Sequence, residues 1–262
     1  MTSPSMFAKI LALPMICLAG APPVLAASTF KSEFAITLYG LPLANTRFTT
    51  VVEDASFTID GSVKSAGVGA LFDDTKGIVA VSGLVAKSGA RALSYSLTYV
   101  SGKKNKSTSI GFSGGSVVST NNVPPVRKKG EWIDVTPEQL KAVSDPLTGM
   151  IVRASSLAEA CNRTVRVFDG QTRADFVMSL ARQRHYKTKG FKGEVAECAV
   201  KFVPVSGFQK GKKQIEYLRK NKNIRILLAP VGATGLYAPI AARVGTTVGT
   251  VAVDAVRFEA VN

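Results

Sequence analysis

Hydrophobic and polar residues alternate over several short stretches of the chain. β-branched and aromatic residues recur in 34–39 and 47–52, and the alternation is strict in 56–60 and 93–99. Glycine, asparagine and aspartate lie between such stretches, at points where a chain can reverse its direction. The pattern predicts a mainly β protein of antiparallel strands, with one face of the sheet buried and the other solvated.

The alternation stops near the middle of the chain, in a connector at about residues 121–160. Residues 121–125 contain two prolines, which lack the N–H group that a strand ladder needs. The sequence Thr-Pro-Glu-Gln at 136–139 has the form of a helix start with a capping box. Asp145 is a second candidate cap, for a segment that runs to about Ser155. We therefore expect one or two short helices between two β-rich halves.

Strand patterns resume after the connector. Residues 164–168 and 173–180 flank Asp169-Gly170, a dipeptide typical of hairpin turns. Further strands are predicted at 197–203 and at 251–258, where the chain is rich in Val and Ala. A sheet with this many strands must coil or close on itself. We expect one curved antiparallel sheet, either a β-spiral or an open, barrel-like sheet.

The first 26 residues have the pattern of a cleavable signal peptide. Lys9 precedes a short apolar run at 10–18, and Val24-Leu25-Ala26 provides small residues for cleavage. The run is shorter than the roughly 20 apolar residues of a membrane span, and Cys17 lacks the preceding small residue of a lipoprotein site. The sequence predicts export to the periplasm, with residues 27–262 forming one β-rich domain and no transmembrane segment after cleavage.

The chain is strongly basic, with 33 Lys and Arg against 18 Asp and Glu. Such charge can serve solubility and protect strand edges, or it can attract an anionic lipid or lipopolysaccharide surface. Export argues against nucleic acid as the partner. The candidate residues for an anionic surface occur in clusters next to predicted turns: Lys103, Lys104, Arg127, Lys128, Lys129, Lys210, Lys212 and Lys213.

Two cysteines, Cys161 and Cys198, remain after the predicted cleavage. In an oxidising compartment an even number of cysteines favours a structural disulfide. A redox-active pair is the alternative, but the two residues are far apart in sequence and do not form a C-x-x-C motif.

Residue types that are catalytic in other proteins occur here without the neighbouring sequence that catalysis requires. Residues 111–115 match the G-x-S-x-G string around Ser113, but residues 116–120 continue as a strand, whereas a nucleophile elbow needs a helix. The string is better explained as a Gly-Gly hairpin between two strands. His185 is the only histidine, which argues against a transition-metal site. The sequence therefore predicts a protein that is not an enzyme and has no metal or other cofactor.

Several segments, taken in order, resemble a known family. They are Tyr39–Ala44, Asp145–Leu147, Cys161, Val167–Arg173, Cys198 and Pro204–Phe208. As a set they resemble the domain-of-unknown-function 3108 family of exported proteins from Gram-negative bacteria. The resemblance implies a β-rich periplasmic protein with a curved or barrel-like sheet, a disulfide between the two cysteines and no established activity. It also implies an architecture like that of alphaproteobacterial β-spiral envelope proteins.

These observations favour a non-catalytic periplasmic binding or scaffold protein that contributes to envelope integrity through a protein partner or an anionic surface. One alternative is a periplasmic carrier that holds a lipid or lipoprotein in an apolar cavity. The second is a cell-wall hydrolase that uses Ser113 and His185.

Overall fold

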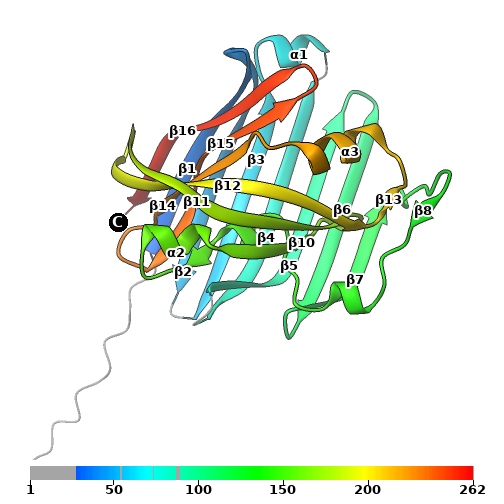
Figure 1. The fold of residues 1–262 in the computed structure, drawn as a ribbon, viewed down its shortest axis with the longest axis horizontal. Coiled ribbons are helices and arrows are strands. Elements are labelled where there is room, and N and C mark those ends of the chain that lie inside the picture. Colours follow the sequence, from blue (N-terminus) through cyan, green and yellow to red (C-terminus); the bar gives the residue numbers. More distant parts are fainter. Residues whose placement is uncertain (1–27, 54, 73, 87–88, 262) are drawn as a thin grey trace, which may run out of the picture.

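The computed structural model describes residues 28–53, 55–72, 74–86 and 89–261 (Figure 1). The predicted signal peptide, residues 1–26, lies outside the described residues. No helix of the described chain is both long enough and apolar enough to cross a bilayer.

In the part of the chain that the structure describes, the fold consists of sixteen strands and a few short helical segments. The strands are β1 (Ser28–Leu38), β2 (Leu41–Glu53), β3 (Ser56–Ser65), β4 (Thr75–Ala86), β5 (Gly89–Ser101), β6 (Lys104–Ser113), β7 (Ser116–Val123), β8 (Trp132–Ile133), β9 (Val152–Arg153), β10 (Arg163–Phe168), β11 (Arg173–Thr188), β12 (Phe191–Ser206), β13 (Phe208–Gln209), β14 (Ile224–Pro230), β15 (Leu236–Thr246) and β16 (Gly249–Val261). The helices are α1 (Val68–Phe72), α2 (Leu157–Cys161) and α3 (Lys213–Lys220), with 3-10 turns at η1 (Glu138–Leu140) and η2 (Thr148–Met150).

Nearly all strands belong to one antiparallel sheet of 14 strands. Its order is β10-β11-β12-β14-β15-β16-β1-β2-β3-β4-β5-β6-β7, with β9 joined at the side. The last strand pairs with the first along almost its whole length, from Thr29 opposite Val261 to Leu38 opposite Val251. This pairing unites the two halves of the chain, so the prediction of one curved antiparallel sheet is confirmed.

The two-residue strand β9 closes part of this sheet into a ring. Val152 pairs with Tyr237 on β15 and also with Gly89 at the start of β5. The path β9-β15-β16-β1-β2-β3-β4-β5 therefore returns to β9 as a closed ring of eight strands. A closed sheet encloses an interior that side chains or a ligand must fill.

The remaining strands continue the sheet past the ring as a spiral. Figure 1 shows β10, β11 and β12 crossing in front of the strands β3–β6, and we call these three strands the outer layer. The two ends of the strand order meet, because the Asn122 side chain on β7 donates a hydrogen bond to the Gly170 carbonyl after β10, at 2.8 Å. Phe168 of β10 packs in one buried cluster with Phe57 and Ile110 of the opposite layer.

The connector differs from the prediction in its helices. The segment after Asp145 forms only the 3-10 turn η2, and Val152 is already part of β9. The predicted helix to Ser155 was wrong, because the chain must be extended at Val152 to pair with both neighbouring strands. At η1 the capping box is present in part, since the Thr136 N–H donates to the Gln139 side-chain oxygen at 3.2 Å. Strand β7 also continues to Val123, just before the first proline.

The turns of the sheet follow the sequence signals closely. The Asp169 carboxylate accepts hydrogen bonds from the N–H groups of Gln171 and Thr172, which fixes the predicted hairpin between β10 and β11. Gly114 and Gly115 both have positive φ, +60° and +79°, and form the turn between β6 and β7. The G-x-S-x-G string is thus a hairpin, as the sequence predicted.

A candidate ligand-binding cavity inside the strand ring

An apolar cavity of about 300 Å³ lies within the strand ring. Its walls come from β1, β2, β3, β5, β15 and β16, together with the connector and the turn before β15. The lining residues are Phe30, Ser32, Phe34, Ile36, Thr46, Phe48, Thr50, Val52, Phe57, Ile59, Ala90, Pro146, Leu147, Met150, Ile151, Val231, Leu236, Ala238, Pro239, Val253 and Phe258. None of these residues carries a charge, and the only polar side chains among them are three hydroxyls.

Strand alternation explains how the cavity arises. Every second residue of a strand faces the same side, so 30, 32, 34 and 36 on β1 and 46, 48, 50 and 52 on β2 all point inward. Large apolar side chains share these positions with the smaller Ser32, Thr46 and Thr50. The small side chains leave the ring interior unfilled, and their aliphatic neighbours keep it apolar.

The connector turn 146–151 forms one wall of the cavity. Asp145 holds this turn, because one carboxylate oxygen accepts hydrogen bonds from the N–H groups of Leu147 at 2.8 Å and Thr148 at 2.9 Å. The backbone of Ser144 bonds to β10 on both sides, with its N–H donating to Arg166 and its carbonyl accepting from Phe168. The turn is thus fixed to the outer layer of the spiral while its apolar side chains line the interior.

The Asp145 carboxyl is completely buried, and its second oxygen has no hydrogen-bond partner among the described residues. Burial raises the pKa of Asp145 above its ordinary value, although the hydrogen bonds from Thr148 and Leu147 oppose this effect. Burial also raises the pKa of the nearby Tyr95 hydroxyl, and the negative charge of Asp145 raises it further. A buried carboxyl under this turn is an electrostatic weak point of the fold.

Two further apolar cavities adjoin the same turn. One, of about 340 Å³, lies between β10–β12 and α3, where Ile215 and Leu218 contribute to its lining. The other, of about 190 Å³, lies against β3–β5 and is lined in part by Leu97. Pro146 lines all three cavities, Leu147 lines the first and the last, and Met150 lines the first and the one under α3. The turn is therefore the common partition between three apolar spaces.

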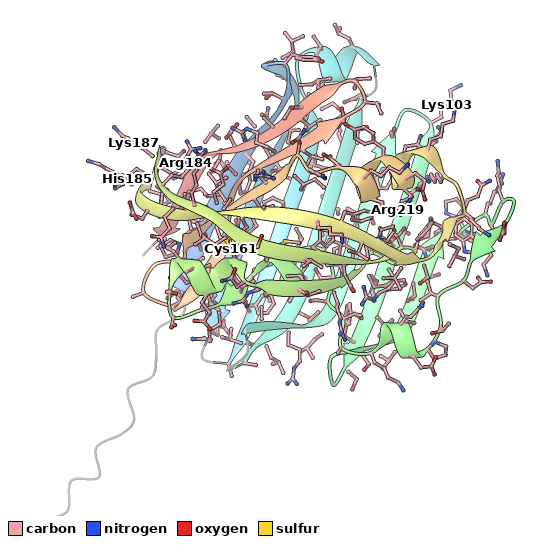
Figure 2. All side chains as sticks on the ribbon, viewed as in Figure 1. Lys103, Cys161, Arg184, His185, Lys187 and Arg219 are labelled. Carbon is pink, nitrogen blue, oxygen red and sulfur yellow. A yellow bond between two sulfur atoms is a disulfide. The ribbon has the colours of Figure 1, made fainter. Side chains whose placement is uncertain are left out.

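The structure separates the cations that the sequence grouped as one candidate surface. Lys103 and Lys104 lie at the turn between β5 and β6, and Figure 2 shows Lys103 at the edge of the molecule. The other six lie in and around the β8–β13 pair, where the N–H of Lys210 donates to the Glu131 carbonyl at 2.8 Å. These six residues, which we call the β8–β13 cations, are Arg127, Lys128, Lys129, Lys210, Lys212 and Lys213.

Two of the β8–β13 cations are already paired. Lys128 forms an ion pair with Asp134, and Lys210 forms one with Glu131 at 2.7 Å. The remaining four form no ion pair with any residue that the structure describes. Four cations at this edge therefore have no carboxylate partner within the described chain.

The residues considered for hydrolysis are placed apart from the cavity. Ser113 is the exposed last residue of β6, and His185 lies on β11 with Nε2 3.2 Å from the Glu194 carboxylate. No hydrogen bond joins Ser113 to His185 in the described chain. Over the same residues, no group of three or more His, Cys, Asp and Glu side chains is arranged to hold a metal ion.

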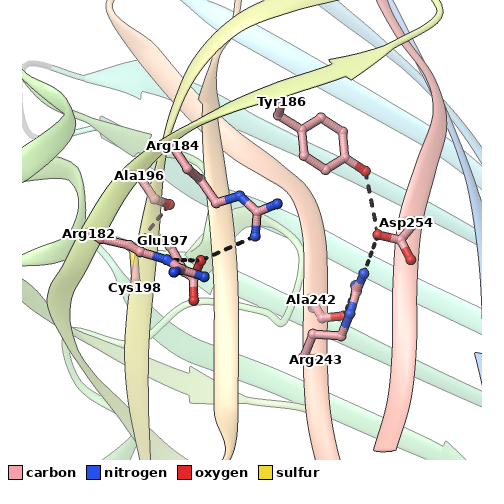
Figure 3. Close-up of polar contacts among 9 residues, drawn as sticks. All are labelled: Arg182, Arg184, Tyr186, Ala196, Glu197, Cys198, Ala242, Arg243 and Asp254. Atoms are coloured by element: carbon pink, nitrogen blue, oxygen red, sulfur yellow. Dashed lines mark hydrogen bonds and ion pairs between the residues drawn. The ribbon is translucent and has the colours of Figure 1, made fainter.

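Two buried or half-buried carboxylates, one on β12 and one on β16, are matched by arginines (Figure 3). Glu197 on β12 lies 3.0 Å from Arg182 Nε and 3.5 Å from Arg184 Nη1. Asp254 on β16 accepts a 2.7 Å hydrogen bond from Arg243 and a 3.5 Å one from Tyr186. Both carboxylates tie neighbouring strands together, and this gives them a structural role.

Sequence reasoning found the inward apolar positions of the first strands but not the cavity. The small residues at inward positions carry hydroxyl groups, so in the sequence they resemble residues of a solvated face. Only the closure of the ring at β9 shows that they point into the interior.

Comparison with known proteins gives a family and a distant structural similarity. The sequence profile of a family described as "Protein of unknown function (DUF3108)" matches residues 33–256. No curated protein matches the sequence. Among solved structures, a protein from Brucella abortus described as a "Beta-barrel-like Protein of Domain of Unknown Function DUF1849" aligns with a TM-score of 0.47 and 8% identity. The alignment covers 90% of this chain and 98% of that one.

Proposed function

The chain belongs to the DUF3108 family of proteins of unknown function, and we propose from its own geometry that it is a non-catalytic binding protein for an apolar ligand. The site is the cavity within the strand ring. The observation that carries the proposal is the uncharged lining of this cavity by side chains from six strands and the connector.

The size of the cavity supports a ligand. Ligand pockets range from about 300 to 1,000 Å³, and engineered cavities of about 150 Å³ already bind benzene. An apolar lining that stays in contact with water is unfavourable, and a ligand that covers it removes this cost.

The lining points to the ligand class. A cavity without charges or side-chain amides binds a polar ligand weakly, because its three hydroxyls provide only a few hydrogen bonds. A hydrocarbon chain gains about 0.8 kcal/mol for each CH₂ group that it buries. We propose an acyl chain as the ligand, which favours a carrier over a pure scaffold.

We place this activity in the periplasm, as part of the maintenance of the cell envelope. The signal-peptide pattern of residues 1–26 supports export, and the buried disulfide is typical of proteins from oxidising compartments. An envelope lipid is then the natural source of the acyl chain.

Filling the cavity tests the proposal. Thr50→Phe adds a ring at an inward position, whereas Thr49→Phe adds the same ring on the opposite face of the same strand. We expect the purified protein to bind the fluorescent fatty acid cis-parinaric acid, the Thr49 variant to bind it equally, and the Thr50 variant to lose about tenfold or more in affinity. Mass spectrometry of the extracted protein should detect a co-purified lipid in the wild type and less of it in the Thr50 variant.

Two outcomes would contradict this function. One is an absence of fatty-acid binding by protein that has first been stripped of lipid. The other is an equal affinity of the Thr50 and Thr49 variants, which would place any binding outside the ring.

A further inference from the structure

Four exposed apolar side chains lie at one end of the strand ring. They are Tyr39 (76% exposed), Leu41 (53%), Leu71 (83%) and Val248 (64%). We call this set the apolar rim. Of the described residues, eight large apolar side chains are more than half exposed, and the other four lie on β4, β7 and β16.

The strand register brings the rim residues together. Leu38 pairs with Leu41 across the β1–β2 turn and with Val251 of β16, so this turn lies beside the β15–β16 turn that carries Val248. The ring of Tyr39 rests on Gly249, where any side chain would collide with it. Helix α1, which carries Leu71, packs on β2 next to the same turn. Figure 1 shows α1 and both turns at the same edge.

The backbone at Tyr39 gives an independent reason to assign this rim a role. Tyr39 has a φ of +52° and Gly40 a φ of +78°, a tight-turn conformation that Asn-Gly adopts easily. Tyrosine is rarely found there, because its Cβ is crowded in the left-handed region. The strain is not offset by burial, since the side chain is mostly exposed. Such a residue is better explained by contact with something outside the protein.

Cations flank the apolar rim. The loop after α3 is fixed to the β15–β16 turn, because Asn221 donates a hydrogen bond to the Gly245 carbonyl at 2.7 Å and the Asn223 carbonyl accepts one from Gly245 at 2.9 Å. Lys222 therefore lies between two residues that are bonded to the end of β15, the strand that leads into the turn with Val248, and Lys220 is the last residue of α3. On the other side, Ser101 pairs with Thr75 next to α1, and the turn with Lys103 and Lys104 follows directly.

Within the described chain, acidic side chains near the rim pair with other cations. Near the rim, Asp74 pairs with Lys76 at 3.1 Å, and Glu216 pairs with Arg219 at 2.6 Å. Lys103, Lys104, Lys220 and Lys222 form no ion pair with the residues that the structure describes. The end of the ring thus carries apolar tips between two groups of free cations.

We propose that this end of the protein docks onto an anionic phospholipid bilayer. Tyrosine and short aliphatic side chains suit the region between headgroups and acyl chains, and unpaired lysines are attracted to the negative surface potential. Neither group suffices alone, because four apolar tips bury little area and exposed charges are screened by salt. Docking would bring an acyl-binding ring to a lipid surface, although the docking itself does not depend on the cavity.

Flotation of the purified protein with lipid vesicles tests this surface. We expect wild-type protein to float with vesicles of phosphatidylethanolamine and phosphatidylglycerol but not with phosphatidylcholine alone. The variant Tyr39→Asn/Leu71→Gln/Val248→Asn should bind at least about tenfold less, with Tyr39→Asn suiting the turn better than tyrosine. The control Ile78→Gln/Val118→Thr/Val256→Thr removes three apolar groups from the strand faces that are also more than half exposed, and it should bind normally.

Charge is tested separately. Lys220→Gln/Lys222→Gln should weaken binding about tenfold at low salt, and added salt should weaken the wild type in the same way. The competing surface is the group of β8–β13 cations, for which Lys129→Gln/Lys212→Gln is the matched variant and should bind normally.

Three results would overturn the proposal: no binding of wild-type protein to anionic vesicles, equal binding to phosphatidylcholine, or a rim variant that binds as well as its control. A loss of binding in the Lys129/Lys212 variant alone would assign the membrane contact to the β8–β13 cations instead. An absence of fatty-acid binding by the lipid-stripped wild type, together with normal flotation, would refute the proposed function and leave docking intact. Normal fatty-acid binding without flotation would do the reverse, so the two proposals fail independently.

Discussion

Cys161 at the end of α2 is bonded to Cys198 in the middle of β12, and both side chains are fully buried. The bond joins the short helix after the connector to a long strand of the outer layer. It closes a loop across 37 residues and lies within a buried hydrophobic cluster of the described residues. The bridge therefore fastens the end of the connector to the sheet.

Removing this bond should cost substantial stability. The chain-entropy model assigns about 4 kcal/mol to a loop of this length, because the bond restricts the unfolded chain. We expect Cys161→Ala/Cys198→Ala to lower the free energy of unfolding by about this amount in urea titrations. Wild-type protein in a reducing agent is the control and should show a similar loss. An unchanged melting temperature in both samples would contradict a structural role.

Gly207 should tolerate no side chain. It links β12 to β13 with a φ of +81°, and a Cβ atom there would lie 1.8 Å from the Gln171 carbonyl oxygen. We expect Gly207→Ala to destabilise the protein by about 3 kcal/mol or more, from backbone strain and collision together.

Gly211 provides a matched control for this collision. Its φ is +74°, but a Cβ atom there would meet no other atom within 4 Å, so Gly211→Ala adds strain alone and should cost about 1 kcal/mol. Equal losses in the two variants, measured by urea denaturation, would show that the contact with Gln171 does not matter.

Asp145 should make stability depend on pH. Burial raises its pKa in the folded protein above the ordinary value of about 4, so the native state holds this proton to higher pH than the unfolded chain does. Below pH 4 the residue is neutral in both states and carries no penalty. As the pH rises from about 4 through the folded pKa, the unfolded chain releases this proton more readily than the native state does. The free energy of unfolding therefore falls over this range.

The variant Asp145→Asn should lack this penalty. Its amide oxygen can still accept the bonds from Leu147 and Thr148, while the amide group replaces the unpartnered oxygen. We expect the stability difference between variant and wild type to shift in favour of the variant as the pH rises from about 4 to 8. Urea titrations across this range measure it, and a constant difference would show that Asp145 does not titrate in the folded protein.

Much of the fold follows from local sequence patterns. Alternation predicted β3 and β5, the Val- and Ala-rich end of the chain predicted β16, and the Asp169-Gly170 and Gly114-Gly115 pairs predicted their turns. These features succeed because they depend on neighbouring residues alone. The family resemblance was likewise confirmed, over residues 33–256.

The closure of the ring could not be predicted in this way. It depends on Val152, which pairs with Gly89 and Tyr237, residues more than 60 positions away in each direction. No local pattern encodes such a contact, and the capping signal of Asp145 pointed to a helix instead. The cavity depends on this closure, so no local signal connects its lining residues with one another.

Leu147 is the partition between the ring cavity and the smaller cavity against β3–β5. Leu147→Ala should join the two spaces, which together measure roughly 490 Å³ if the volumes of about 300 and 190 Å³ simply add. A longer acyl chain then gains buried CH₂ groups that the wild type cannot accommodate, at about 0.8 kcal/mol each. We expect the variant to prefer stearic over lauric acid more strongly than the wild type does, in displacement of cis-parinaric acid.

Leu97→Ala is the control, because it enlarges only the smaller cavity and leaves the partition in place. Both variants should lose about 2 kcal/mol or more of stability, so stability alone cannot produce the difference. The same chain-length preference in both would show that Leu147 does not limit the site.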